Sequence, residues 1–137
     1  MRRSYWDTCV LIYRLQSVEP WRTRIANALA QTGEPRLAVS ELSRMECRVK
    51  PLREGDTSAL ARFDRFFTSP MITIVPLGRA VFDLATELRA GHRIKTPDAL
   101  HLAAALEAGC SEFWTNDRRL ERAAEGRLRV VSVDDLT

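Results

Sequence analysis

Lysine is almost missing from this chain of 137 residues: among 21 basic residues only Lys50 and Lys95 are lysine, and the rest are arginine. Long apolar runs are missing too, because charged residues or Pro interrupt each candidate within about ten residues, whereas a membrane span needs about 20. The start of the chain has neither a long apolar segment nor a small-residue cleavage site. We therefore expect neither a membrane protein nor a secreted one.

Cysteine and histidine are scarce, with three cysteines and two histidines in the chain. Cys9, Cys47 and Cys110 are odd in number and widely spaced, and no C-x-x-C motif occurs. This pattern indicates neither a disulfide framework nor a zinc site. Reduced thiols are typical of cytoplasmic proteins, so we expect a cytoplasmic location.

The chain contains enough apolar sequence for one globular domain over residues 1–137, since 45% of its residues are hydrophobic and 28% are charged. The net charge is +3. The planar guanidinium of arginine suits phosphate groups, so the arginine excess is compatible with a nucleic-acid partner. GC-rich coding would produce the same excess, and composition alone does not separate the two explanations.

Short strand patterns alternate with helical ones along the chain. We expect strands at residues 4–6, 36–39, 71–75, 112–115 and 128–133. We expect helices at residues 8–15, 19–31, 40–50, 57–67, 78–90, 96–108 and 117–125, with Ser40 and Thr96 as N-caps and a helix–helix connection at 51–56. This alternation predicts an α/β fold with a mainly parallel sheet covered on both faces. In such folds the working site lies at the carboxyl ends of the strands.

Three aspartates occupy positions where such a site would form. Asp7 follows the first expected strand and Asp117 the fourth, so both are expected at the carboxyl edge of the sheet. Asp98 lies in the first turn of a helix that is apolar almost all round, where the helix dipole favours an ionised carboxylate. Each also has a structural explanation, since Asp7 and Asp117 would cap helices and Asp98 would complement the dipole.

Glu46 is the fourth unusual acid. It lies four residues after Leu42, on the side of the helix where Leu42, Met45 and Val49 form the apolar stripe. A partly desolvated carboxylate is unfavourable unless it is paired or bound to a cation, and a buried arginine would serve as well. Gathered in one pocket, the four acids would raise one another's pKa unless a divalent cation bound there. Oxygen-only ligands favour Mg²⁺ or Mn²⁺, which activate water for attack on phosphate, as a metal-dependent nuclease requires.

Four segments in chain order carry a resemblance to a known family: D-T-C-V-L-I from Asp7, S-x-x-S-x-x-E from Ser40, P-D-A-L-H-L-A-A-A from Pro97 and W-T-N-D-x-x-L from Trp114. In them the sequence resembles the PIN-domain ribonucleases, and among these the VapC-type toxins of bacterial toxin–antitoxin pairs. The resemblance spans essentially the whole chain. It implies a three-layer α/β/α sandwich, Mg²⁺- or Mn²⁺-dependent cleavage of RNA, a homodimer, and inhibition by a cognate antitoxin protein.

The resemblance also implies roles for individual residues. The acids that would hold metal and carry catalysis are Asp7, Glu46, Asp98 and Asp117. Thr8 and Thr115 match the supporting hydroxyls of the family, and Asn116 lies beside them. For Asp117 the role is either that of a ligand or that of a residue that positions water.

Basic residues beside Asp98 and Asp117 are candidates for binding the phosphates of a substrate, namely Arg93, Lys95, Arg118 and Arg119. Solvated surface charge explains each of them equally well. His101, three residues after Asp98, would complete a D-x-x-H metal pair, but we favour simple packing beside the site.

Two other functions fit parts of the pattern. A phosphotransferase of the haloacid-dehalogenase kind also has an Asp after its first strand, but it needs a second Asp two residues later, where this chain has Cys9. A PIN-like module that binds RNA or a protein without cutting would share the fold. Metal-dependent turnover separates that module from a nuclease.

Overall fold

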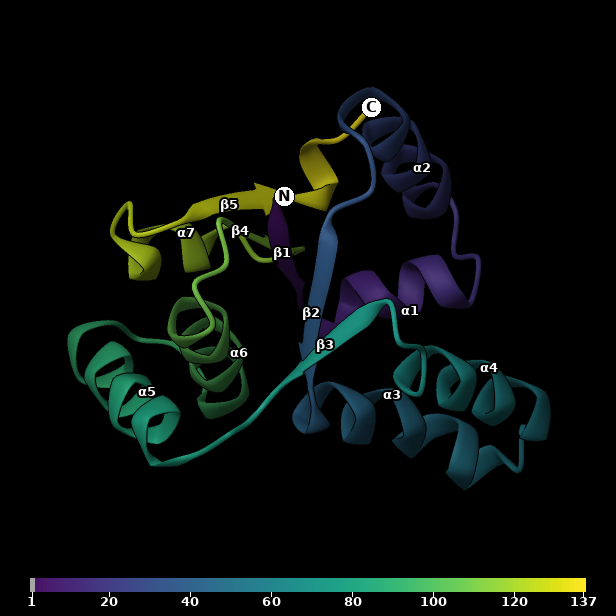
Figure 1. Cartoon of the computed structure of the whole chain (residues 1–137), viewed down its shortest axis with the longest axis horizontal. Helices are drawn as coiled ribbons and strands as arrows, with labels where there is room; N and C mark the ends of the chain where they lie inside the picture. Colours follow the sequence, from purple (N-terminus) through teal and green to yellow (C-terminus); the bar gives the residue numbers. More distant parts are fainter. Residues whose placement is uncertain (1) are drawn as a thin grey trace.

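The computed structural model describes residues 2–137, in which five short strands form one sheet. In chain order they are β1 (Arg3–Trp6), β2 (Arg36–Ser40), β3 (Ile72–Val75), β4 (Glu112–Thr115) and β5 (Arg129–Ser132). All neighbouring strands pair in parallel, in the order β3-β2-β1-β4-β5 (Figure 1). Each connection between consecutive strands must therefore run back over one face of the sheet, and each connection contains at least one helix.

The helices form two layers, one on each side of the sheet (Figure 1). One layer consists of α1 (Thr8–Leu15), α2 (Trp21–Thr32), α3 (Glu41–Glu54) and α4 (Thr57–Phe67). The other consists of α5 (Arg79–Gly91), α6 (Thr96–Glu107) and α7 (Arg119–Ala124). The predicted three-layer α/β/α sandwich with a parallel sheet is therefore confirmed. No helix within residues 2–137 has the length and apolar character needed to cross a bilayer.

The side chains of the central strands alternate between the two layers, as the twofold repeat of a strand requires. In β1, Tyr5 packs in the core under α5–α7, whereas Trp6 packs in the core under α1–α4. Phe113 and Trp114 of β4 follow the same pattern, and they stack on Tyr5 and Trp6 with ring centroids 5.7 and 5.1 Å apart. Aromatic pairs across neighbouring strands thus fix the centre of the sheet on both faces.

The strand order places a change of direction at β1. From β1 the chain moves outward through β2 to β3, and then crosses to the opposite side of β1 to form β4 and β5. In open parallel sheets such a switch point creates a crevice at the carboxyl ends of the strands, where ligands bind. Asp7 follows β1 and Asp117 follows β4, so both lie at this switch point.

The predicted elements are all present, but three details were wrong. α3 continues to Glu54, so the predicted connection at 51–56 shrinks to the residues after it. Pro51, which lacks an N–H and usually ends a helix, lies buried in the last turns of α3. The helix stops at Gly55, whose φ of 68° is left-handed. The predicted N-cap of α6 was Thr96. The helix instead begins at Thr96, and its N-cap is Lys95.

The third error concerns the inward face of α3. Met45 and Val49 are 56% and 45% exposed, so they do not form the predicted buried stripe. The buried positions are instead Ser43, Cys47 and Pro51, which are small or compact and allow α3 to approach the sheet closely.

Candidate active site

Asp7 is fixed at the switch point by its own hydrogen bonds. As the N-cap of α1 it accepts the backbone N–H of Thr8 at Oδ1 (2.8 Å), while its Oδ2 accepts the hydroxyl of Thr115 (2.9 Å). Its side chain is nearly enclosed, with the residue 8% exposed. The capping explanation is therefore correct, and the cap lies at the carboxyl edge between β1 and β4.

Glu46 points from α3 toward the same edge and is half-buried. Its Oε1 accepts hydrogen bonds from Thr8 Oγ1 (2.7 Å) and from His101 Nε2 (2.6 Å). Burial alone would raise the pKa of this carboxyl group, but the hydrogen bonds from His101 and Thr8, with the charge of His101, outweigh burial and hold the pKa below its usual value. The partner of Glu46 is thus a histidine and not the buried arginine considered from the sequence.

Asp98 differs from the other acids because nothing in residues 2–137 donates a hydrogen bond to it or pairs with it. It is half-buried in the first turn of α6. Partial burial raises the pKa of its carboxyl group, and the negative charges of Asp7 and Asp117 raise that pKa further, against the opposing effects of His101 and Lys95. A bound cation would offset the repulsion between Asp98 and the two neighbouring aspartates.

Asp117 is held by Arg119. Its Oδ1 accepts Nε of Arg119 (3.0 Å) and its Oδ2 accepts Nη2 (2.8 Å), while the backbone N–H of Arg119 also donates to Oδ1 (3.0 Å). These hydrogen bonds hold the pKa of Asp117 below its ordinary value. The backbone N–H of Asp117 donates to Thr115 Oγ1 (3.1 Å), so Thr115 links Asp117 to Asp7.

The other residues predicted for the site have varied positions. Thr8 and Thr115 each contact an acid of the quartet, whereas the amide of Asn116 donates to Tyr13 Oη (3.1 Å) and to none of the four acids. Burial raises the pKa of both Cys9 and Cys47 to about 12, so these thiols stay protonated at neutral pH. Cys47 is buried in the core under α1–α4, and Cys9 packs against the same core.

The acids fit a hard divalent cation in donor type and charge. All of the donors are carboxylate oxygens, and Asp98 is an unpaired carboxylate beside like charges, which is the situation that Mg²⁺ or Mn²⁺ relieves. Within residues 2–137, however, no three His, Cys, Asp or Glu side chains are grouped closely enough to hold an ion as they stand. Binding would therefore require carboxylate side chains to turn toward the cation.

A basic groove adjoins the acids. One cavity of about 400 Å³ is lined by Asp98 and Asp117 together with Arg89, Arg93, Lys95 and Arg119. It shares Arg93 and Arg119 with a larger hollow of about 990 Å³ that also contains Arg118 and Arg122. Of the four predicted phosphate ligands, Arg119 pairs with Asp117 and Arg118 pairs with Asp135, while Arg93 and Lys95 form no ion pair within residues 2–137.

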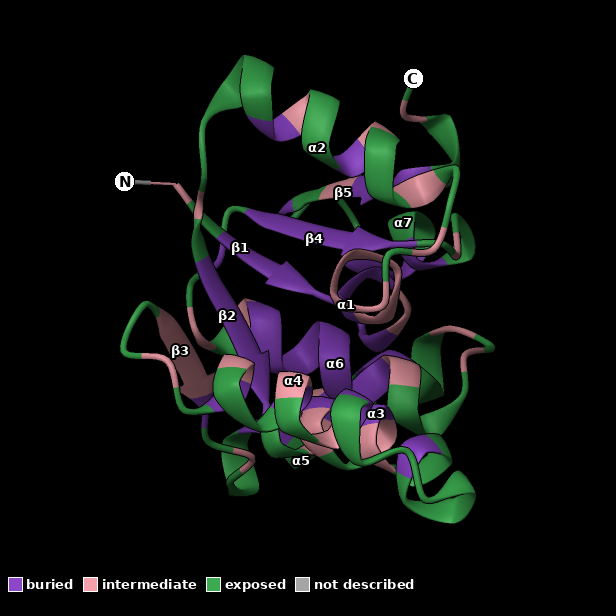
Figure 2. Ribbon diagram, turned by 90° about the vertical axis from the view of Figure 1, so that its right-hand side faces the viewer, coloured by how far each residue is buried: buried purple, intermediate pink, exposed green. Residues whose placement is uncertain are grey.

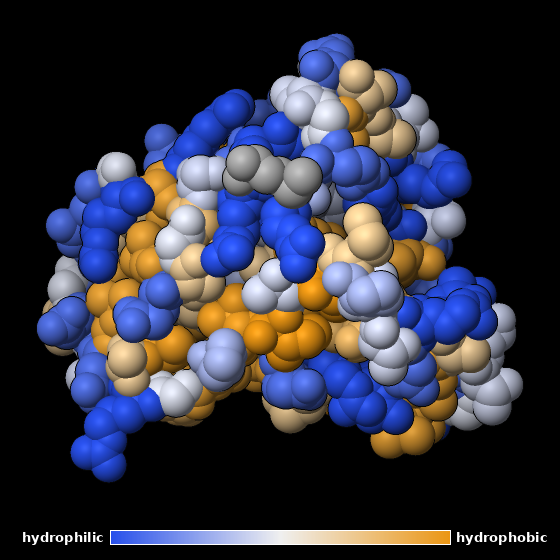
Figure 3. Space-filling view, viewed as in Figure 1, coloured by the Kyte–Doolittle hydropathy of each residue, from blue (hydrophilic) through white to orange (hydrophobic). Residues whose placement is uncertain are grey.

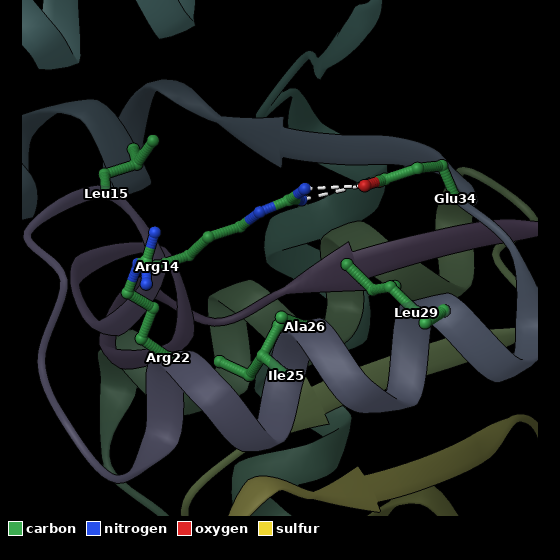
Figure 4. Close-up of a pocket in the computed structure, with 8 residues that line it drawn as sticks. Arg14, Leu15, Arg22, Ile25, Ala26, Leu29 and Glu34 are labelled. Atoms are coloured by element: carbon green, nitrogen blue, oxygen red, sulfur yellow. Dashed lines mark hydrogen bonds and ion pairs between the residues drawn. The ribbon is translucent and has the colours of Figure 1, made fainter.

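Another hollow lies away from the acids, between α1 and α2. It measures about 650 Å³, and its apolar floor includes Ile25 and Leu29. Figure 4 shows Arg14 and Glu34 reaching toward each other across it, and they form an ion pair of 2.6 Å. Neither residue approaches the acidic quartet, so this hollow is not part of the candidate active site.

Sequence reasoning missed the roles of two residues. From the sequence, Tyr5 is expected only as part of the first strand, and His101 as a residue that packs beside the site. The structure instead joins Tyr5 Oη to His101 Nδ1 (2.7 Å) and His101 Nε2 to Glu46 (2.6 Å). The one available signal was the polar His101 within a helix that is otherwise apolar.

The fold and this site define an α/β protein with carboxylates at the switch point of a parallel sheet. The sequence profile of the PIN domain family matches residues 4–126, and the chain belongs to this family. No curated protein matches the sequence.

Solved structures with a similar fold include toxins and toxin–antitoxin complexes. One is DNA-bound VapBC from Salmonella typhimurium (TM-score 0.74, 17% identity, covering 97% of this chain and 99% of that one). Another is a toxin–antitoxin complex from Klebsiella pneumoniae (TM-score 0.71, 24% identity, covering 95% and 97%). A third is VapC20 from Mycobacterium tuberculosis, a toxin that cleaves the sarcin–ricin loop (TM-score 0.71, 15% identity, covering 88% and 94%). The predicted membership of the PIN domain family is thus confirmed, and the chain shares its fold with solved structures of VapC-type toxins.

Proposed function

We propose that this chain is a metal-dependent endoribonuclease, built as a single domain over residues 1–137, and the toxin of a type II toxin–antitoxin pair. The observation that carries the proposal is the half-buried, unpaired Asp98 beside Asp7 and Asp117, at the switch point and next to a basic groove. Membership of the PIN domain family supports a nuclease. A PIN-like module that binds without cutting is the alternative that the experiment below distinguishes.

In the proposed mechanism the chain's own residues orient the reactants. Asp7, Glu46 and Asp98 would hold Mg²⁺ or Mn²⁺, with Asp117 as a further ligand or as the residue that orients water. When bound, the ion supplies an activated water and neutralises charge that develops on the phosphate. Thr8 and Thr115 keep Glu46 and Asp7 in place through their hydroxyls. A carboxylate of the quartet accepts the proton of the attacking water.

The nuclease activity is tested with purified protein and a mixed pool of tRNA, rRNA and mRNA in Mg²⁺ or Mn²⁺. We expect cleavage that EDTA abolishes and that excess Mn²⁺ restores. Attack by water with departure of the 3′ oxygen should leave 5′-phosphate and 3′-hydroxyl ends, which distinguishes the reaction from that of metal-independent ribonucleases. The test also includes RNA from a cell extract. If the folded protein binds Mn²⁺ but cuts neither this RNA nor any RNA in the pool, the result would favour the module that binds without cutting.

We propose that the basic groove binds the RNA backbone, mainly through Arg93 and Lys95. Replacing both with Ala should raise KM for RNA about fivefold or more and leave kcat unchanged. Because each lost phosphate contact removes about 0.7 from the slope of log affinity against log salt, that slope should fall by about 1.4. The measurement is cleavage kinetics over a range of salt concentrations.

The matched control replaces Arg36 and Arg127 with Ala. Arg36 begins β2 and Arg127 precedes β5, so both lie at the amino edge of the sheet, opposite the site. This control removes the same charge, and KM should stay at its wild-type value. Equal effects of the two double variants would show that net charge, and not the groove, sets RNA affinity.

The proposed partners are RNA, a cognate antitoxin and a second copy of the chain. The similar folds seen in VapBC complexes support an antitoxin. Large hydrophobic side chains also remain exposed on this chain, namely Met45, Val49, Leu52, Met71 and Phe82. Figure 3 shows hydrophobic residues gathered in the middle of the face where β3 lies. Such surface favours protein contacts.

The free thiols support the proposed cytoplasmic location.

A further inference from the structure

His101 is a buried polar side chain whose two ring nitrogens both have partners. It lies one turn after Asp98 on α6 and is 1% exposed. Nε2 is 2.6 Å from Glu46 Oε1, and Nδ1 is 2.7 Å from Tyr5 Oη. Buried polar atoms require such partners, so the two contacts fix the rotation of the imidazole ring.

The contact with Glu46 determines which nitrogen carries hydrogen. Glu46 Oε1 already accepts the hydroxyl hydrogen of Thr8, and a carboxylate that binds a cation carries no hydrogen of its own, so a bare Nε2 would place two lone pairs 2.6 Å apart. Nε2 therefore carries hydrogen and donates it to Glu46. The Tyr5 hydroxyl has one hydrogen: it goes to Ser40 Oγ when Oη accepts from an Nδ1–H, and it goes to Nδ1 when that nitrogen is bare. In both states Nε2–H donates to Glu46, but the hydrogen bond from Tyr5 to Ser40 is kept only when Nδ1 carries hydrogen.

Tyr5 anchors this arrangement in the core of the sheet. It is fully buried in β1, stacks on Phe113 of β4, and its Oη lies 2.9 Å from Oγ of Ser40 at the end of β2. Ser40 is also the N-cap of α3, the helix that carries Glu46. Tyr5 and His101 thus tie Glu46 to β1, β2 and α6 at once.

The two donors to Glu46 converge on one oxygen. Thr8 Oγ1 and His101 Nε2 both bond to Oε1, and no group within residues 2–137 donates to Oε2. The donors therefore restrict the carboxylate to one orientation while one oxygen stays available. Loss of the His101 contact would leave Thr8 as the single side-chain donor, and the carboxylate would rotate more freely.

We propose that His101 is a positioning residue for Glu46: its Nε2–H fixes the carboxylate so that Oε2 is presented as a ligand for the divalent cation. Tyr5 acts behind it by fixing the imidazole. The inference rests on the proposed metal-dependent function, and it assigns His101 no direct contact with the metal or with RNA.

The test compares His101→Gln with His101→Asn. The amide nitrogen of Gln lies as many bonds from the backbone as Nε2 does and can still donate to Glu46, whereas Asn is shorter and reaches only toward Tyr5. Mn²⁺ affinity without RNA is measured by electron paramagnetic resonance, and cleavage kinetics and thermal unfolding are measured in parallel. We expect His101→Asn to weaken Mn²⁺ binding about 10–100-fold, as loss of such supporting contacts usually does, and to lower kcat with KM for RNA unchanged. His101→Gln should stay within about threefold of wild type for both quantities, since it keeps the donor.

Wild-type Mn²⁺ affinity in His101→Asn, or equal losses in the Asn and Gln variants, would overturn the inference. If the Asn variant does not fold, Tyr5→Phe decides instead, because it removes the contact that fixes the imidazole and keeps the aromatic ring. Weaker Mn²⁺ binding in folded Tyr5→Phe supports the inference, and unchanged binding overturns it. Failure of the wild-type protein to bind Mn²⁺ or cleave RNA would refute the proposed function itself, so the two failures are distinguishable.

Discussion

The Asp7→Asn variant is expected to fold normally and to lose RNA cleavage by at least about 100-fold, because removal of one preorganised electrostatic group typically lowers kcat about 10²–10³-fold. The amide oxygen of Asn can still accept the N–H of Thr8, and the amide nitrogen can face Thr115 Oγ1, so the geometry around β1 and β4 is kept. Only the negative charge is lost. Single-turnover cleavage, circular dichroism and Mn²⁺ binding measure the three parts of this prediction.

A matched control is available in Asp56→Asn. Asp56 is also an N-cap, and its Oδ1 accepts the N–H of Ala59 (3.0 Å) at the start of α4. Both substitutions exchange a capping carboxylate for an amide, so their effects on stability should be similar and small. Cleavage should fall in the Asp7 variant alone. Wild-type cleavage by folded Asp7→Asn would remove the quartet from the proposed mechanism.

The second large effect is expected on stability. Leu102→Ala should lower the free energy of unfolding by about 3 kcal/mol, within the 2–5 kcal/mol that a buried Leu→Ala change usually costs. Leu102 is fully buried in α6, which is covered along most of its length by the sheet and its neighbouring helices (Figure 2). The loss is a large share of the total stability of a typical domain, about 5–15 kcal/mol. Urea unfolding gives the measurement.

Leu52→Ala is the corresponding control, because Leu52 is 63% exposed on α3. This exposed substitution should change stability by no more than about 0.5 kcal/mol. A loss below about 1 kcal/mol in Leu102→Ala would contradict the dense packing of α6, since cavity formation accounts for much of the expected cost.

The positions of Asp7 and Asp117 at the sheet edge could be predicted, because each follows a strand and parallel strands end at a common edge. Their adjacency could not. It requires β4 to lie next to β1 and not next to β3, and nothing in the local spacing of the strands distinguishes these orders. Long-range packing decides strand order, so local spacing placed each acid separately, and only the family resemblance implied that the four form one site.

Glu46 was expected to be partly desolvated, and it is half-buried, but the supposed cause was wrong. The helical spacing of apolar residues predicted that Met45 and Val49 face inward, whereas both are exposed. Ser43 lies inside because α3 packs close to Tyr5, and a side chain longer than serine would not fit as easily. Hydrophobicity alone does not identify the inner face of a helix when that face is small and hydrogen-bonded.

The order of the strands also has a consequence for the protein during its own synthesis. β1 is translated first, yet its second neighbour, β4, begins only at Glu112, and Asp117 comes later still. Any ribosome-bound fragment that ends before β4 has a central strand that can pair on one side only, with β2, and it lacks Asp117. Because the proposed nuclease site includes Asp117, we expect its activity to appear only when the polypeptide is almost finished.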